Sequence, residues 1–327
     1  MRTAATVGAL ALATLVLAPS GVHAASSGEG SLTSSTGVSA AVGDPAPTPA
    51  PTPTPTPTPT SAPTSEPAPQ GTVIDTVAYG SHSRQRMDVW YQPDDLRRPG
   101  VFLIHGGWWS SGDKKYMTEI SRSYAELGYT VFNINYRLSG DASWPAQRVD
   151  AFDAIATARR HSALWSFNPN NYVVIGFSAG GHLATAVGTY KTGGLPGLKG
   201  VVGISPVVSP LTAYIEGAES ADPDKRRLRT AAIRLAGGCG PSGKCARIWQ
   251  SMEVPEHASR GDAPILSVHA ENEFVPPVHS TQLQARLRQV GVQMTVLTEP
   301  GIDHSAPLYR LPGVAEKVQT WVAEKLL

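Results

Sequence analysis

The stretch that most constrains this chain is residues 173–182, VVIGFSAGGH. An apolar run ends in Gly-x-Ser-x-Gly, and small residues then begin a helix. A sharp strand-to-helix turn of this kind holds its serine in a strained backbone conformation and needs small neighbours, which Gly176 and Gly180 supply. The pattern predicts that the Ser178 hydroxyl stands above one edge of a sheet. The alternative is an ordinary glycine-rich turn with an unreactive serine.

The first 70 residues have a composition that does not favour a folded core. Residues 1–24 contain one early positive charge, an apolar run and a small-x-small end, which is typical of a secretory signal peptide cut after Ala24. A membrane anchor is the alternative, although the apolar run is short for one. Residues 25–70 are rich in Ser, Gly, Ala, Thr and Pro, which predicts an extended disordered linker. That linker is either a stalk that holds the domain near a cell wall or matrix, or a plain tail.

Residues 71–327 are long enough for one α/β domain with a full core. The net charge of +1 favours neither nucleic acid nor an acidic surface as a partner. Cys239 and Cys245 are the two cysteines, and in a secreted chain they are expected to form a small disulfide loop, with two free thiols as the alternative. A zinc site needs more ligands than this pair offers, so neither a metal nor a cofactor is expected.

Apolar runs and helical periods alternate along this domain. Strands are predicted over residues 72–79, 85–91, 101–104, 130–135, 172–175, 200–204, 264–269 and 293–297. Helices are predicted over residues 114–127, 145–161, 179–189, 279–290 and 314–326. This alternation predicts a mostly parallel sheet covered by helices on both faces. Residues 211–259 interrupt it and are expected to form a cap-like insertion over the carboxyl ends of the strands, or a surface excursion away from the substrate.

Four features then occur in a recognisable order: His105-Gly106-Gly107 after a strand, the Gly-x-Ser-x-Gly turn, an acidic loop after a late strand, and a histidine before the last helix. From about residue 73 onward the chain resembles the α/β-hydrolase fold, and more closely its esterase/lipase branch with the bacterial feruloyl and acetyl esterases. Residues 135–138, 144–147 and 275–277 also match that branch. The resemblance implies a serine hydrolase that cleaves a small-molecule or glycan-linked carboxylic ester through an acyl-enzyme. Two alternatives remain: the tryptophans after His-Gly-Gly are similar to the kynurenine formamidase group, which cleaves amides, and a catalytically weak binding or cell-surface protein is also possible.

The resemblance places the base at His304, in the loop before the last helix. A serine needs such a base within hydrogen-bond reach, and the base needs an acidic orienter. Here the chain departs from the family, because its acid loop is one residue short. Counting forward from the strand gives Glu273, which we favour. Counting back from Val275 gives the uncharged Asn272, and Glu271 is a further candidate.

The backbone N–H groups of Gly106, Gly107, Trp108 and Ala179 are expected to form the oxyanion hole. They lie in or directly after the His-Gly-Gly loop and the Gly-x-Ser-x-Gly turn that carry the resemblance. Glycines at such positions allow the backbone to approach the substrate closely. Trp108 and Trp109 are expected to line the substrate pocket; packing under the insertion is the alternative.

Overall fold

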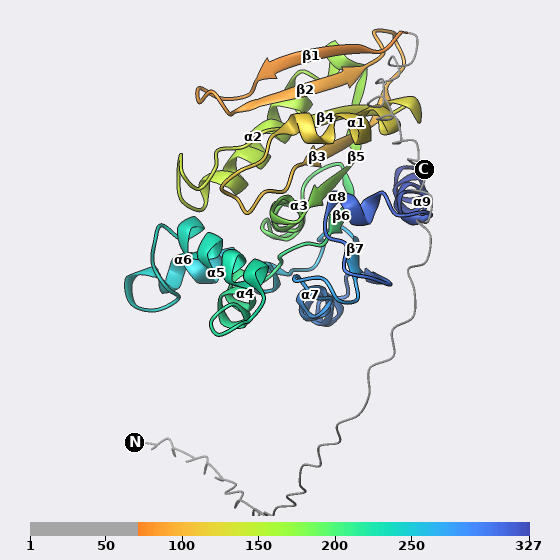
Figure 1. The fold of residues 1–327 in the computed structure, drawn as a ribbon. Helices are drawn as coiled ribbons and strands as arrows, with labels where there is room; N and C mark the ends of the chain where they lie inside the picture. The colour runs from red at the N-terminus through yellow and green to blue at the C-terminus, as the bar shows by residue number, and fades with distance from the viewer. Residues whose placement is uncertain (1–70) are drawn as a thin grey trace, which may run out of the picture. The chain divides into compact units, whose positions relative to one another are not determined.

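A computed structural model describes residues 71–327, so the predicted signal peptide and linker lie outside the described residues. Within these residues the chain forms an eight-stranded sheet in the order β1-β2-β4-β3-β5-β6-β7-β8 (Figure 1). The strands are β1 (Val73–Ala78), β2 (Arg86–Tyr91), β3 (Arg98–Ile104), β4 (Thr130–Ile134), β5 (Phe167–Phe177), β6 (Leu198–Ile204), β7 (Ile265–Ala270) and β8 (Met294–Glu299). β2 pairs antiparallel with both β1 and β4, and the pairs from β4 to β8 are parallel.

Helices cover both faces of the sheet, which explains why its central strands are apolar on both sides. α2 (Ala146–Arg160), α3 (Ala179–Thr189) and α7 (Val278–Gln289) contribute to the core on one face. α1 (Thr118–Glu126) and α9 (Val314–Leu326) contribute to the core on the other. The predicted mostly parallel sheet with helices on both faces is confirmed.

Most predicted elements lie within a few residues of the observed ones, and α3 and α9 have the predicted bounds. The helix predicted over residues 114–127 instead begins as a 3-10 turn, η1 (Lys114–Met117), before α1. Asp113 caps that turn by accepting a hydrogen bond from the Lys115 N–H. Two short elements were not predicted, η2 (Ser162–Trp165) and α8 (Ala306–Tyr309).

The insertion after β6 is helical rather than irregular. It contains α4 (Pro210–Glu216), α5 (Pro223–Leu235), η3 (Gly243–Cys245), α6 (Ala246–Met252) and η4 (Val254–His257). Figure 1 shows α4, α5 and α6 grouped together at the lower left. Cys239 and Cys245 form a disulfide in this insertion, with their Cα atoms 6.2 Å apart. Trp144 connects the insertion to the start of α2, because its backbone N–H donates to the Leu235 carbonyl.

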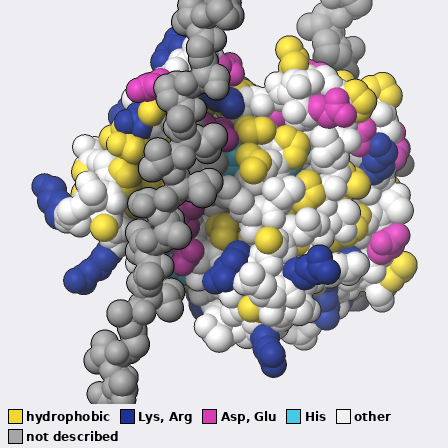
Figure 2. Space-filling model, turned by 90° about the horizontal axis from the view of Figure 1, so that it is seen from below, with side chains coloured by type: hydrophobic (Ala, Val, Ile, Leu, Met, Phe, Trp, Pro, Cys, Tyr) yellow, Lys and Arg dark blue, Asp and Glu magenta, His cyan; other side chains and the backbone are white. Residues whose placement is uncertain are grey.

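The surface of the domain carries charges of both signs. In Figure 2, the part of the face that can be seen shows acidic and basic side chains lying among hydrophobic ones. This agrees with the net charge of +1 for the whole chain. No helix within residues 71–327 combines the length and the hydropathy that a membrane span requires.

Candidate active site

Ser178 lies at the turn between β5 and α3 in the strained conformation that the motif predicts. Its φ is 53° and its ψ is −116°, a region that a residue with a side chain rarely adopts. The turn is so tight that a Cβ on Gly176 would lie 2.1 Å from the Gly180 carbonyl oxygen. A Cβ on Gly180 would lie 2.2 Å from the Ile104 carbonyl oxygen. Only glycine fits at either position, and the turn holds the Ser178 hydroxyl at the carboxyl edge of the sheet.

Three side chains from separate loops meet at this edge. The Nε2 atom of His304, from the loop after β8, lies 2.8 Å from the Ser178 Oγ. The Nδ1 atom of His304 is hydrogen-bonded to Oε2 of Glu273, from the loop after β7. Glu273 and Ser178 are both buried, whereas the His304 side chain keeps partial contact with solvent. The arrangement is that of a nucleophile, a base and a charged orienter in hydrogen-bonded sequence.

The other two candidates for the acid point elsewhere. Glu271 and Asn272 are exposed, and no hydrogen bond joins either side chain to His304 within the described part of the chain. Their backbone N–H groups instead donate to the carbonyls of Glu299 and Gly301, at 2.9 and 3.0 Å. Those two bonds fix the path of the short loop so that Glu273 is the residue that turns inward.

Glu273 is held as a carboxylate by several donors. Its Oε1 accepts from the Ala270 N–H at 3.0 Å and lies 3.0 Å from Nδ1 of His269. Burial alone raises the pKa of Glu273, but the hydrogen bonds from His269 and His304 outweigh it and lower the pKa below its ordinary value. A negative charge therefore stands behind His304, where it stabilises the imidazolium that forms when His304 takes a proton.

Two other histidines near the serine, His182 and His105, are buried and held by neighbouring side chains and backbone. The indole N–H of Trp109 donates to Nδ1 of His182 at 3.1 Å, and Nε2 of His182 lies 2.8 Å from the Met252 carbonyl oxygen. His105 stacks on Tyr136, with ring centroids 4.5 Å apart. Burial lowers the pKa of each to about 4, so both are neutral at physiological pH. Neither contacts the Ser178 hydroxyl.

The loop after β3 brings free backbone donors to the serine. Gly107 has a φ of 119° and Trp108 a φ of 58°. A Cβ on Gly106 would lie 3.2 Å from the Ser178 Cβ, so this loop passes directly beside the nucleophile. Within residues 71–327, the N–H groups of all four predicted donors, Gly106, Gly107, Trp108 and Ala179, have no backbone acceptor in the turns and loops. Unpaired N–H groups beside a nucleophile are what an oxyanion hole requires.

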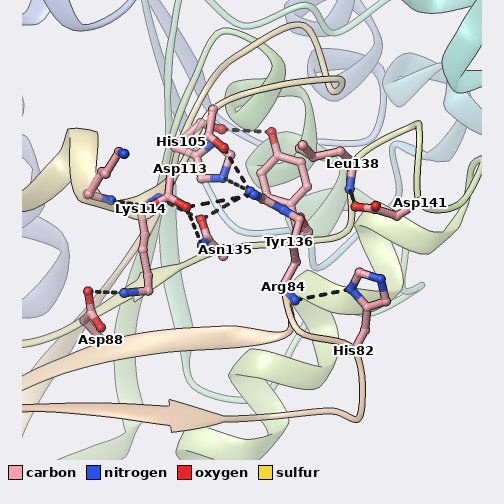
Figure 3. A network of polar contacts seen from close by, with 12 residues as sticks. His82, Arg84, Asp88, His105, Asp113, Lys114, Asn135, Tyr136, Leu138 and Asp141 are labelled. Atoms are coloured by element: carbon pink, nitrogen blue, oxygen red, sulfur yellow. Dashed lines mark hydrogen bonds and ion pairs between the residues drawn. The ribbon is translucent and has the colours of Figure 1, made fainter.

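Arg84, from the turn between β1 and β2, contacts the two ends of the glycine-rich loop at His105 and Gly112 (Figure 3). Its guanidinium donates to the carbonyls of Tyr136 and Gly112 at 2.8 and 2.9 Å, and it lies 3.4 Å from Nε2 of His105. The Tyr136 hydroxyl in turn donates to the His105 carbonyl at 3.1 Å. Sequence reasoning missed Arg84, because no motif surrounds it and its partners are distant in sequence.

The two adjacent tryptophans occupy different places. Trp108 is half-buried and lines a groove of about 350 Å³ together with the rest of the glycine-rich loop and with Ser305. Trp109 is fully buried and packs edge-on against His182. The expectation that Trp109 lines the pocket is therefore wrong: the left-handed backbone at both tryptophans turns Trp108 toward the groove and Trp109 into the core.

The chain is similar to esterases in sequence and in fold. Residues 87–200 match the family model described as BD-FAE. A probable carboxylic ester hydrolase of Mycobacterium tuberculosis, LipM, is 36% identical over 33% of this chain and 26% of its own length. Esterase LipC of the same organism is 27% identical over 71% of this chain and 59% of its own length. The chain thus spans about a quarter and somewhat more than half of these two relatives.

Among solved structures, esterase B from Lactobacillus rhamnosis superposes with a TM-score of 0.66 at 21% identity. The match covers 79% of this chain and 86% of that one. At this identity the match speaks for the fold, and the sheet order and turn geometry described above agree with it. Among the described residues no cluster of His, Cys, Asp or Glu is arranged to hold a metal ion. The chain therefore has the α/β-hydrolase fold and is similar to esterases in sequence.

Proposed function

We propose that this chain is a carboxylic ester hydrolase that works through an acyl-enzyme on Ser178. The observation that carries the proposal is the hydrogen-bonded series from Ser178 through His304 to a buried, ionised Glu273. A serine hydroxyl is a weak nucleophile at neutral pH and becomes effective when a base stands within hydrogen-bond reach. The similarity to esterases supports an ester, rather than another acyl compound such as an amide, as the substrate.

Each residue has one role in the proposed reaction. The Ser178 oxygen attacks the ester carbonyl carbon while His304 Nε2 takes the hydroxyl proton. The N–H groups of Gly106, Gly107, Trp108 and Ala179 are the candidate donors to the negative oxygen of the tetrahedral intermediate. The intermediate collapses, the carbon–oxygen bond to the alcohol breaks, and His304 returns the proton to the leaving alkoxide. Water then repeats the sequence on the acyl-serine, with His304 again as the base.

Labelling with a fluorophosphonate and turnover of p-nitrophenyl acetate test this proposal together. We expect the reagent to modify Ser178, and we expect Ser178→Ala to abolish both labelling and turnover. Ser123→Ala is the control, because its hydroxyl bonds the Ile120 carbonyl on α1, away from the site. Labelling that survives in Ser178→Ala would exclude Ser178 as the nucleophile. N-formylkynurenine, assayed beside the ester, measures whether the same site prefers an amide.

We also propose that the chain is secreted and cut after Ala24. The signal-like residues 1–24 support this, as does the disulfide between Cys239 and Cys245, since such bonds persist in oxidising compartments. The mass of the protein isolated from culture medium and from cells tests it: secretion predicts a form in the medium that begins at Ala25.

A further inference from the structure

A column of four side chains, each in contact with the next, leads from the candidate base to the insertion. The ring centroids of His304 and Phe274 are 4.1 Å apart, and those of Phe274 and Trp108 are 5.1 Å apart at an angle of 16°. The guanidinium carbon of Arg227, on α5, lies 4.6 Å from the centre of the Trp108 ring. The base loop, the acid loop, the glycine-rich loop and the insertion each supply one member.

Arg227 differs from the basic side chains beside it. Lys225 pairs with Glu216 at 3.5 Å, and Arg226 donates to the backbone carbonyls of Ser220 and Ala221. Arg229 donates to the Tyr214 carbonyl. Arg227 is exposed, and within the part of the chain that the structure describes its guanidinium has the Trp108 ring as a neighbour but no hydrogen-bond acceptor or ion-pair partner.

Contact with an aromatic ring leaves the hydrogen-bonding capacity of an arginine intact, because the N–H donors of a guanidinium lie in its plane, in the fork that matches a carboxylate. α5 carries five basic side chains and one acidic side chain, and Glu216, Glu219 and Asp222 lie just before it in the chain. An anion that reaches this rim therefore meets the donors of Arg227 itself rather than a broadly positive surface.

The position of Trp108 connects this rim to the reaction. Trp108 is half-buried and lines the groove of the glycine-rich loop, whose Gly106 lies against Ser178. The N–H of Trp108 is also one of the candidate oxyanion donors. A substrate with its ester carbonyl at Ser178 that extends past the Trp108 ring reaches Arg227. We propose that Arg227 and Trp108 form a specificity site for esters that carry a carboxylate on the acyl or the alcohol side. The inference rests on the proposed function, since it names the substrate class of the same site.

Two matched pairs of esters test the site. p-Nitrophenyl hemiglutarate against p-nitrophenyl valerate places the charge on the acyl side. 4-Acetoxybenzoate against 4-acetoxybenzamide places it on the alcohol side. We expect Arg227→Gln to lower kcat/KM for the charged member of one pair about 5- to 20-fold more than for its neutral partner. Arg227→Lys is expected to retain a part of the preference, because it keeps the charge and loses the fork. The selectivity is expected to weaken with added salt.

Arg226→Gln is the matched control, because it removes the same charge at the neighbouring position. The Arg226 guanidinium binds the backbone carbonyls of Ser220 and Ala221. We expect it to leave both ratios unchanged within about twofold. Equal losses for charged and neutral esters in Arg227→Gln would show that Arg227 only supports Trp108, and unchanged ratios in both pairs would show no role; either result overturns the proposal. Failure of the wild-type protein to hydrolyse the neutral esters would instead contradict the proposed function.

Binding without turnover gives a second, independent readout. Monomethyl glutarate titrated into Ser178→Ala protein is expected to bind with a Kd, measured by calorimetry, that rises at least about fivefold when Arg227→Gln is added. An unchanged Kd in the double variant would contradict the proposed site, whatever the ratios of kcat/KM in the hydrolysis assays.

Discussion

The Nδ1 atom of His269 lies 3.0 Å from Oε1 of Glu273, so one carboxylate is hydrogen-bonded to two histidines. Nδ1 also lies 3.0 Å from the Val275 carbonyl oxygen, and because both neighbours are acceptors, Nδ1 carries a proton and donates. Nε2 lies 2.7 Å from the Ser280 Oγ. His269 therefore fixes one oxygen of Glu273 while the other faces His304.

This relationship predicts that His269 acts as a positioning residue. His269→Asn keeps a donor near the place of Nδ1, and we expect kcat to stay within about threefold of the wild-type value. His269→Leu removes the donor and is expected to lower kcat about 10- to 100-fold with KM little changed. The loss is expected to be larger at pH 5 than at pH 8, because Glu273 without this donor has a higher pKa and becomes protonated sooner as the pH falls. Equal losses in both variants would point to packing alone.

Glu273 itself is expected to contribute through its charge. Glu273→Gln keeps the shape of the side chain but removes the charge that stabilises the imidazolium, and we expect kcat to fall about 10²- to 10⁴-fold. Glu271→Gln and Asn272→Asp are matched controls in the same loop, and since both side chains are exposed we expect less than about tenfold change from either. Values of kcat on one small ester decide this; a gain of activity in Asn272→Asp would move the acid to that position.

The Gly-x-Ser-x-Gly motif located Ser178 and the family resemblance located His304, and alternating strands and helices bring their two loops to one edge of the sheet. Sequence spacing was insufficient for the acid. The short loop permits two counts, and the choice depends on the backbone bonds from Glu271 and Asn272 to the end of β8 and the residues just after it. The same limit applies to Arg84 and Arg227. Their contacts arise from how a hairpin and an insertion pack against a distant loop, which local patterns do not encode.

The disulfide in the insertion is expected to stabilise the domain. Closing a loop of the size between Cys239 and Cys245 contributes about 2 kcal/mol in the chain-entropy account. The double variant Cys239→Ser/Cys245→Ser is expected to lower the Tm by about 4 to 8 °C. A reducing agent is expected to shift the Tm of the wild-type protein by a similar amount and to leave that of the variant unchanged. A reductant effect on the variant would show that the shift has another cause.

Glu253, at the base of the insertion, predicts a pH dependence of stability. Its carboxylate accepts from the Leu211 N–H at 2.8 Å and from the Ser209 hydroxyl at 2.5 Å, at the start of α4. Burial raises the pKa of Glu253 to about 7 in spite of these bonds. A carboxyl group with a raised folded-state pKa favours folding most below its unfolded pKa, and this contribution is lost as the pH rises through about 7.

We therefore expect the free energy of unfolding to fall by about 1 to 3 kcal/mol between pH 4.5 and pH 8 on account of this one group. Glu253→Gln cannot ionise, so the difference in Tm between it and the wild-type protein is expected to favour the wild type at pH 5 and to shift toward the variant at pH 8. Glu126→Gln, at an exposed position on α1, is the matched control and is expected to follow the wild-type curve. Parallel curves for wild type and Glu253→Gln over this range would show that Glu253 titrates normally. The proton would then be lost near the ordinary value, and the insertion would carry no such dependence.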